Sequence, residues 1–263
     1  MTPILLLGAG RMGGAMLEGW RAAGAFAPGD LILCDPHPGD AALAAARVGA
    51  TLNPDHAALG AAQTVLLAVK PQLWREAAAA YAPHIARDAV IVSIAAGVRS
   101  ADIATAFGRP TARVMPTTAV AIRKGVATVF AATRIAAAAA HALFSPIATV
   151  VDVADEGLID VATAVSGSAP AYLYAFVEAL EAAGEAAGLP RETAQTLARA
   201  TIAGAAALME ASPDDPAELR RQVTSPAGTT EAALKVLQGK GGLDTLLNEA
   251  VRVAVTRARE LAG

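Results

Sequence analysis

The loop Gly8-Ala9-Gly10-Arg11-Met12-Gly13 is the segment whose residue types and spacing indicate chemistry most directly. It follows an apolar, strand-like run and opens a segment with a helical pattern, the context in which three such glycines bind a dinucleotide pyrophosphate. Gly8 permits the tight turn, Gly10 lets the phosphates approach the backbone, and Gly13 lets the helix pack closely. An ordinary turn would not need three glycines at this spacing. We therefore predict an NAD or NADP site on a helix N-terminus, and a reductase.

Asp35 is the second residue of interest, because it ends the next expected strand, 22 residues after Gly13. An acidic side chain there accepts hydrogen bonds from the adenosine ribose hydroxyls, which favours NAD over NADP. Arg11 and His37 could offset part of the repulsion between Asp35 and a 2′-phosphate, so both cofactors stay open. The alternative role for Asp35-Pro36 is to open a turn.

Two further strand ends, Ala68-Val69-Lys70-Pro71 and Ala95-Ala96-Gly97, are expected at the carboxyl edge of the same sheet, where such folds bind ligands. We expect both to face the cofactor, with Lys70 as a cation at the edge of an apolar crevice. The alternative for Lys70 is a solvated side chain in a loop.

Metal chemistry is not expected. The four histidines, His37, His56, His84 and His141, show no ligand spacing with one another or with carboxylates. The acidic residues Asp152, Asp155, Glu156 and Asp160 are interpreted as helix caps and a solvated turn rather than as a catalytic pair.

The composition limits the class of protein. The chain has 263 residues, 54% hydrophobic and 17% charged, with a net charge of −3, which excludes disorder and argues against a nucleic-acid partner. Its apolar stretches are too short or too interrupted to span a membrane, and the N-terminus has no secretory pattern. The single cysteine, Cys34, excludes an intrachain disulfide and suits a cytoplasmic location, and we expect it to be a buried packing residue.

The elements that must position these residues form two halves. In the first, short β-branched runs alternate with Ala-rich helical stretches, the pattern of a parallel sheet covered by helices. Strands are expected at 4–7, 31–34, 64–69, 90–94, 113–115, 126–130 and 147–151, with helices beginning near residues 12, 40, 73, 100 and 135. We predict a Rossmann domain over residues 1–156, with a mostly parallel sheet.

From about Leu158 the strand signals stop, and residues 157–263 are predicted to form an all-helical domain. Breaks are expected at 188–190, 212–216 and 239–242. Between Ala169 and Glu185 the apolar residues nearly encircle the helix axis, which favours a second buried surface and a homo-oligomer. The alternative is that alanine alone inflates this apolar character.

At the level of motifs the chain resembles the pyrroline-5-carboxylate reductase family, which makes proline, over nearly its whole length. The resemblance rests on Gly8–Gly13, Val69-Lys70-Pro71, Ser93–Val98, Arg113-Val114-Met115-Pro116, Ser166-Gly167-Ser168 with Pro170-Ala171-Tyr172, and Val223–Thr230.

This resemblance implies a helical C-terminal domain that forms an interlocked homodimer, with higher oligomers such as decamers and an active site shared between subunits. It also implies that Ser225, Gly228, Thr229 and Thr230 hold the carboxylate of the substrate, pyrroline-5-carboxylate, and that Thr230 hydrogen-bonds its imine nitrogen as the catalytic side chain. Hydroxyls and N–H groups at a helix N-terminus can bind an anion without a lysine or arginine. The alternative is a plain helix cap made by Thr224 or Ser225.

Two positions depart from the family pattern. Thr117 replaces the usual Asn of the loop after Met115-Pro116, where the resemblance implies a cofactor contact, and Ala169 replaces the usual Gly after Ser168. A hydroxyl reaches less far than an amide, so the contact made by Thr117 is the more affected.

Two other functions are compatible with parts of this pattern. β-Hydroxyacid dehydrogenases share this layout but carry a catalytic lysine at the position of Leu173. A noncatalytic nucleotide sensor would not need the intact loop Ser225–Thr230.

Overall fold

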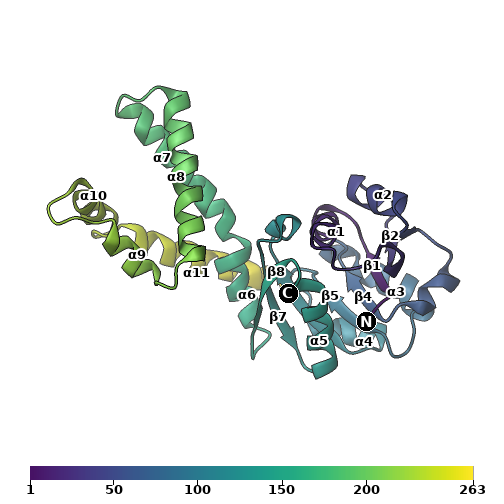
Figure 1. Ribbon diagram of the computed structural model, residues 1–263. Helices are drawn as coiled ribbons and strands as arrows, with labels where there is room; N and C mark the ends of the chain where they lie inside the picture. Colours follow the sequence, from purple (N-terminus) through teal and green to yellow (C-terminus); the bar gives the residue numbers. More distant parts are fainter. Residues whose placement is uncertain (263) are drawn as a thin grey trace. The chain divides into compact units, whose positions relative to one another are not determined.

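The computed structural model describes residues 1–262, with side chains as far as residue 260. The chain divides into two compact units, one made of Met1–Gly167 with the segment from Val255 onward, the other of Ser168–Ala254 (Figure 1). The expected domain boundary between residues 156 and 157 stays a prediction, and residue 263 lies outside the described residues.

The first unit is built on one eight-stranded sheet with the order β3-β2-β1-β4-β5-β6-β7-β8. Only the β6–β7 pair is antiparallel, and the other neighbours run parallel, which confirms the mostly parallel Rossmann-like sheet. The strands are β1 Ile4–Leu7, β2 Leu31–Cys34, β3 Thr51–Leu52, β4 Thr64–Leu67, β5 Val90–Ser93, β6 Thr111–Pro116, β7 Gly125–Ala131 and β8 Ala148–Asp152.

Helices cover both faces of this sheet (Figure 1). They are α1 Arg11–Ala23, α2 Asp40–Arg47, α3 Trp74–Tyr81, α4 Ser100–Phe107, α5 Arg134–Phe144 and α6 Leu158–Ala162, with short 3-10 turns η1 Pro28–Asp30, η2 His56–Ala61, η3 Pro71–Leu73, η4 Ala82–His84 and η5 Thr118–Ile122. Because successive strand residues point to opposite faces, Leu6 joins the core cluster of Trp20 and Phe144, whereas Leu5 joins that of Trp74 and Phe107.

The second unit is helical, as the sequence predicts. It contains α7 Ala169–Ala186, α8 Arg191–Ala211, α9 Pro216–Gln222, α10 Thr229–Leu237 and most of α11 Leu243–Ala262, and it follows a π-helical turn, Thr163–Gly167. Helices α7 and α8 pack as a hairpin (Figure 1), with Gly184 close to Ala194. Within the described residues, none of the helices is both long enough and apolar enough to cross a bilayer.

Candidate active site

The glycine loop joins β1 to α1 in the geometry expected of a pyrophosphate site. Gly8 has φ +93°, and a Cβ there would lie 2.8 Å from the Ala68 carbonyl oxygen; a Cβ on Gly13 would lie 2.3 Å from the Gly8 carbonyl oxygen. Packing therefore excludes side chains at both positions. Among the described residues, nothing lies within 4 Å of a Cβ built on Gly10, so the space beside this glycine is open to a ligand.

The N-terminus of α1 is equipped to receive an anion. Gly10 is its N-cap residue, no side chain caps the helix in the described chain, and no acidic residue lies in the first turn. The N–H groups of this turn consequently keep their positive potential for a phosphate.

The predicted cofactor residues gather at one edge of the sheet. Strands β2, β1, β4, β5 and β6 are consecutive neighbours and run parallel, so the segments that follow them leave from the same carboxyl edge. Those segments carry the whole predicted set: Gly8, Gly10, Arg11, Met12, Gly13, Asp35, Ala68, Val69, Lys70, Pro71, Ala95, Ala96, Gly97 and Thr117.

Asp35 directly contacts the glycine loop. Its Oδ2 accepts a hydrogen bond from the Ala9 N–H at 2.6 Å, and its Oδ1 accepts one from the His37 N–H at 2.7 Å. The carboxylate therefore closes a turn through His37, which is the alternative role given above for Asp35-Pro36, and it also lies beside the glycine loop. Each oxygen keeps a lone pair that a ribose hydroxyl could use.

Cys34, just before Asp35, is a buried packing residue, as the sequence predicts. Burial raises the pKa of its thiol to about 11, which keeps it protonated at neutral pH and unreactive as a nucleophile.

Thr117, at the position that departs from the family pattern, is turned toward its own loop. Its hydroxyl accepts a hydrogen bond from the Val126 N–H at 3.0 Å, and its backbone N–H donates to the Val126 carbonyl at 2.9 Å. Thr117 thus fastens η5 to β7, and its cofactor contact stays a prediction. Lys70 and Arg11 are both exposed. Exposure fits a cation that faces a ligand and equally fits a solvated side chain, so the role of Lys70 stays a prediction.

The loop Ser225–Thr230 belongs to the second unit and leads into α10. The Gly228 N–H donates to the Ser225 carbonyl at 3.0 Å, and the Ala227 N–H donates to Glu231 Oε2 at 2.7 Å, with Ala227 at φ +58°. These contacts bring Ser225, Gly228, Thr229 and Thr230 together at the helix N-terminus. The three hydroxyl-bearing residues of this group are exposed.

The alternative of a plain helix cap is wrong for this loop. Gly228 is the N-cap residue of α10, and within the described chain no side chain caps it. The Thr224 hydroxyl donates to the Arg220 carbonyl at 2.6 Å instead. The loop hydroxyls and first-turn N–H groups are consequently available to a ligand. Unlike α1, this helix carries an acidic residue in its first turn, Glu231, whose Oε2 accepts the Ala227 N–H.

Ala169 is the first residue of α7, and Ser168 separates it from the π-helical turn that ends at Gly167. Leu173, one turn further on, is 44% exposed and apolar. It offers no proton donor at the position where β-hydroxyacid dehydrogenases carry lysine, which argues against that rival.

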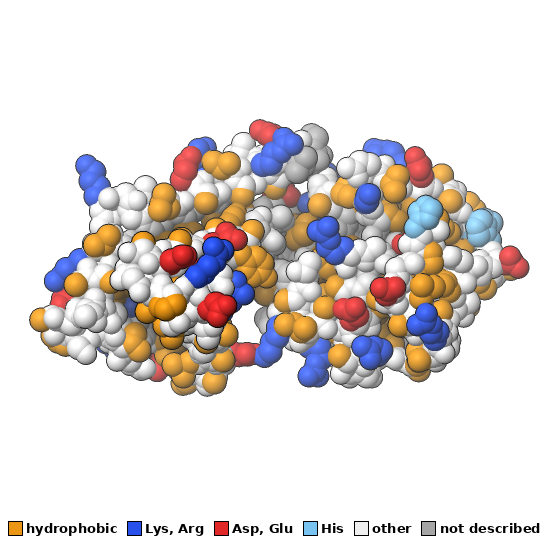
Figure 2. Space-filling model, turned by 90° about the horizontal axis from the view of Figure 1, so that it is seen from above, with side chains coloured by type: hydrophobic (Ala, Val, Ile, Leu, Met, Phe, Trp, Pro, Cys, Tyr) orange, Lys and Arg blue, Asp and Glu red, His pale blue; other side chains and the backbone are white. Residues whose placement is uncertain are grey.

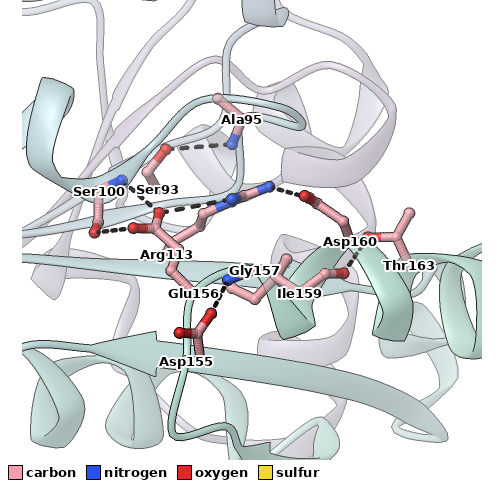
Figure 3. Close-up of polar contacts among 10 residues, drawn as sticks. All are labelled: Ser93, Ala95, Ser100, Arg113, Asp155, Glu156, Gly157, Ile159, Asp160 and Thr163. Atoms are coloured by element: carbon pink, nitrogen blue, oxygen red, sulfur yellow. Dashed lines mark hydrogen bonds and ion pairs between the residues drawn. The ribbon is translucent and has the colours of Figure 1, made fainter. Parts of the chain in front are cut away.

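A buried arginine forms a polar cluster that the sequence interpretation missed (Figure 3). Arg113 lies in β6 opposite Ser93 of β5, and its side chain is 4% exposed. Its Nη2 donates to Asp160 Oδ1 at 2.9 Å, and its Nη1 lies 3.6 Å from Glu156 Oε1. Glu156 also accepts hydrogen bonds from the N–H and the hydroxyl of Ser100, at 2.7 and 2.9 Å.

The interpretation of Glu156 and Asp160 as part of a solvated turn was therefore wrong, although Glu156 does cap α4. A buried guanidinium needs carboxylate partners, and these two supply them. The open cavity of about 680 Å³ beside the cluster contains none of the predicted site residues in its lining.

The residues at the sheet edge fit a dinucleotide: a glycine loop open at Gly10, an uncapped helix N-terminus and a carboxylate at the end of β2. Fold and site together define the class, a Rossmann-type NAD(P)-dependent oxidoreductase.

The family model described as NADP oxidoreductase, coenzyme F420-dependent, matches residues 3–97, and the model for pyrroline-5-carboxylate reductase dimerisation matches residues 156–261. The pyrroline-5-carboxylate reductase of Pseudomonas aeruginosa is 40% identical, across 99% of this chain and 97% of its own length. The chain belongs to the pyrroline-5-carboxylate reductase family.

Solved structures agree with this assignment. The pyrroline-5-carboxylate reductase of Coxiella burnetii superposes with a TM-score of 0.91 at 31% identity, covering 100% of this chain and 99% of its own. The Plasmodium falciparum enzyme, solved with NADP bound, gives 0.83 at 22% identity, covering 100% and 98%, and at that identity the likeness shows the fold alone. The expected family, the fold class and the class of enzyme are thus confirmed.

Proposed function

We propose that this chain reduces 1-pyrroline-5-carboxylate to L-proline with NADH or NADPH, the last step of proline biosynthesis. The observation that carries the proposal is the loop Ser225–Thr230, which presents exposed hydroxyls and an uncapped helix N-terminus in a chain of this family. This arrangement suits a carboxylate, because the loop provides hydrogen-bond donors without a cationic side chain.

The reaction needs little acid–base chemistry from the protein. When bound, a reduced nicotinamide would supply the hydride for the carbon of the C=N bond, and the imine nitrogen would enter protonated or take its proton from solvent. In our proposal Ser225, Gly228 and Thr229 hold the substrate carboxylate, while the Thr230 hydroxyl hydrogen-bonds the imine nitrogen and orients the ring. The cofactor is held by the glycine loop, Asp35, the strand ends and Thr117. Catalysis then comes mainly from orienting two reactants away from water.

We also propose that the second unit forms a homodimer through its helices. Of its described hydrophobic residues, only Ala194 and Ala198 are buried, while apolar side chains such as Tyr174, Phe176 and Leu180 are exposed along α7. Hydrophobic side chains are spread over the visible face of this unit (Figure 2). A decamer built from such dimers is the higher assembly that the family resemblance implies, and a cytoplasmic location suits a chain whose single cysteine is a free thiol.

The test is an assay of the purified protein with pyrroline-5-carboxylate and each reduced dinucleotide in turn. We expect oxidation of at least one dinucleotide with L-proline formed in equal amount. A panel of β-hydroxy acids with oxidised dinucleotide is the matched control and should give no turnover. Absence of turnover with both NADH and NADPH would remove the central proposal, and turnover with a β-hydroxy acid would favour the rival dehydrogenase.

A further inference from the structure

Asn53 lies beside the candidate nucleotide site, and the motifs of the sequence do not mark it. It directly follows β3, and its own N–H donates to the Leu33 carbonyl of β2 at 2.7 Å. Its φ of +47° lies in the left-handed region, which asparagine tolerates better than most residues. Both features fix the direction of its side chain with respect to the end of β2.

The Asn53 amide binds the backbone of Asp35 at two points. Asn53 Oδ1 accepts a hydrogen bond from the Asp35 N–H at 2.9 Å, and Asn53 Nδ2 donates to the Asp35 carbonyl at 2.8 Å. This contact needs a short side chain with one donor and one acceptor, so aspartate or serine could not replace it fully.

The Asp35 carboxylate is fixed as well, because Ala9 and His37 each donate a backbone N–H to one of its oxygens. Four hydrogen bonds therefore hold this residue with its charge against the glycine loop. In the described part of the chain no lysine or arginine forms an ion pair with this carboxylate, and its hydrogen-bond partners are the two backbone N–H groups.

A dinucleotide bound on this edge brings its adenosine ribose to the end of β2. The 2′-hydroxyl of NADH can donate to Asp35, whereas the 2′-phosphate of NADPH adds negative charge beside a carboxylate that cannot easily turn away. We propose that Asn53 is a positioning residue that sets the cofactor preference: by holding Asp35 in place, it makes the enzyme favour NADH over NADPH. The inference rests on the proposed function, which leaves the choice between NADH and NADPH open.

The test compares kcat/KM for NADH and NADPH, with pyrroline-5-carboxylate, in the wild type and in Asn53→Gly. Glycine keeps the left-handed backbone but removes the amide. We expect the wild type to favour NADH about tenfold or more, and Asn53→Gly to lower that ratio by about 3- to 10-fold, the effect of a lost hydrogen bond or two. The change should lie in KM for the dinucleotide, with kcat altered less than about twofold. Asp35→Ser should raise kcat/KM for NADPH.

The chain has one other asparagine, Asn248, whose Nδ2 donates to the Asp244 carbonyl on α11. Asn248→Ala is the matched control and should leave the ratio unchanged. A wild type that uses NADPH as well as NADH, or an Asn53→Gly variant with an unchanged ratio, would overturn the inference. Titration of the free enzyme with NADH and NADPH measures the same preference without substrate. It therefore decides the inference even if pyrroline-5-carboxylate is not turned over and the proposed function fails.

Discussion

At the scale of single residues, the proposed catalytic group is a weak one. A threonine hydroxyl neither takes nor gives a proton easily at neutral pH, so Thr230 can assist only by its position at the start of α10. That position is set by the backbone of the loop, in which the Ala227 N–H is bound to Glu231 and the Gly228 N–H to Ser225. The hydroxyl should therefore matter for turnover and not for the cofactor, which we assign to the first unit.

Thr230→Ala should lower kcat by about 10²-fold, the size of effect that follows the loss of one positioned hydrogen-bonding group, while the Kd for the dinucleotide changes less than about twofold. Steady-state kinetics and a fluorescence titration with NADH measure the two quantities. Thr230→Ser keeps a hydroxyl and should recover most of the turnover. A variant that loses dinucleotide affinity in proportion to kcat would contradict the assignment of Thr230 to the substrate.

At the scale of elements, the sequence predicts every strand except β3 to within about two residues at each end. Parallel strands are buried on both faces, so they appear as continuous apolar runs such as Ile4–Leu7. Strand β3 has only two residues, and its pattern differs little from that of a loop. The antiparallel direction of β7 depends on pairing with β6 and is not encoded in a local pattern.

The same distinction explains the candidate site. The glycine loop is local and could be predicted, whereas Asn53 and Asp35 are 18 residues apart, and Arg113 and Asp160 are 47 apart. Such pairs are determined by strand order and register. A buried arginine within an apolar strand is the signal that could have revealed the second pair, since it requires carboxylate partners.

The Arg113 cluster ties β6 to α6 and, through Glu156 and Ser100, to the start of α4. Arg113→Met would leave two partly buried carboxylates without their cation, and we expect the free energy of unfolding to fall by about 3–5 kcal/mol. Urea denaturation followed by circular dichroism measures the change. Adding Glu156→Gln and Asp160→Asn to Arg113→Met should recover part of the loss.

Arg99 lines the same cavity but is exposed, so Arg99→Met is the control, with an expected change within about 0.5 kcal/mol. If Arg113→Met cost no more than this control, the cluster would not stabilise the sheet.

At the scale of the whole molecule, the two units differ in how they bury apolar surface. Both hydrophobic clusters found among the described residues belong to the first unit, and they contain Trp20, Phe144, Trp74 and Phe107 among others. The second unit packs α7 against α8 through small residues and has little core of its own. A helical unit of this kind needs further burial to be stable, and a matching surface on a second copy would supply it.

Phe176 and Leu180, which are 39% and 40% exposed on α7, are the positions at which to test this dimer. The double variant Phe176→Asp/Leu180→Asp should shift the protein from dimer to monomer, because carboxylates in a buried apolar interface would lose their hydration. Analytical ultracentrifugation measures the state of association. If the active site is shared between subunits, as the family resemblance implies, kcat should fall more than about tenfold while NADH binding changes less than about twofold, since we assign the dinucleotide site to the first unit.

Ile135→Asp, at a 53% exposed apolar position on α5, is the matched control and should leave association and turnover unchanged. A double variant that stays dimeric would place the interface elsewhere, and a fully active monomer would show that each chain carries a complete site.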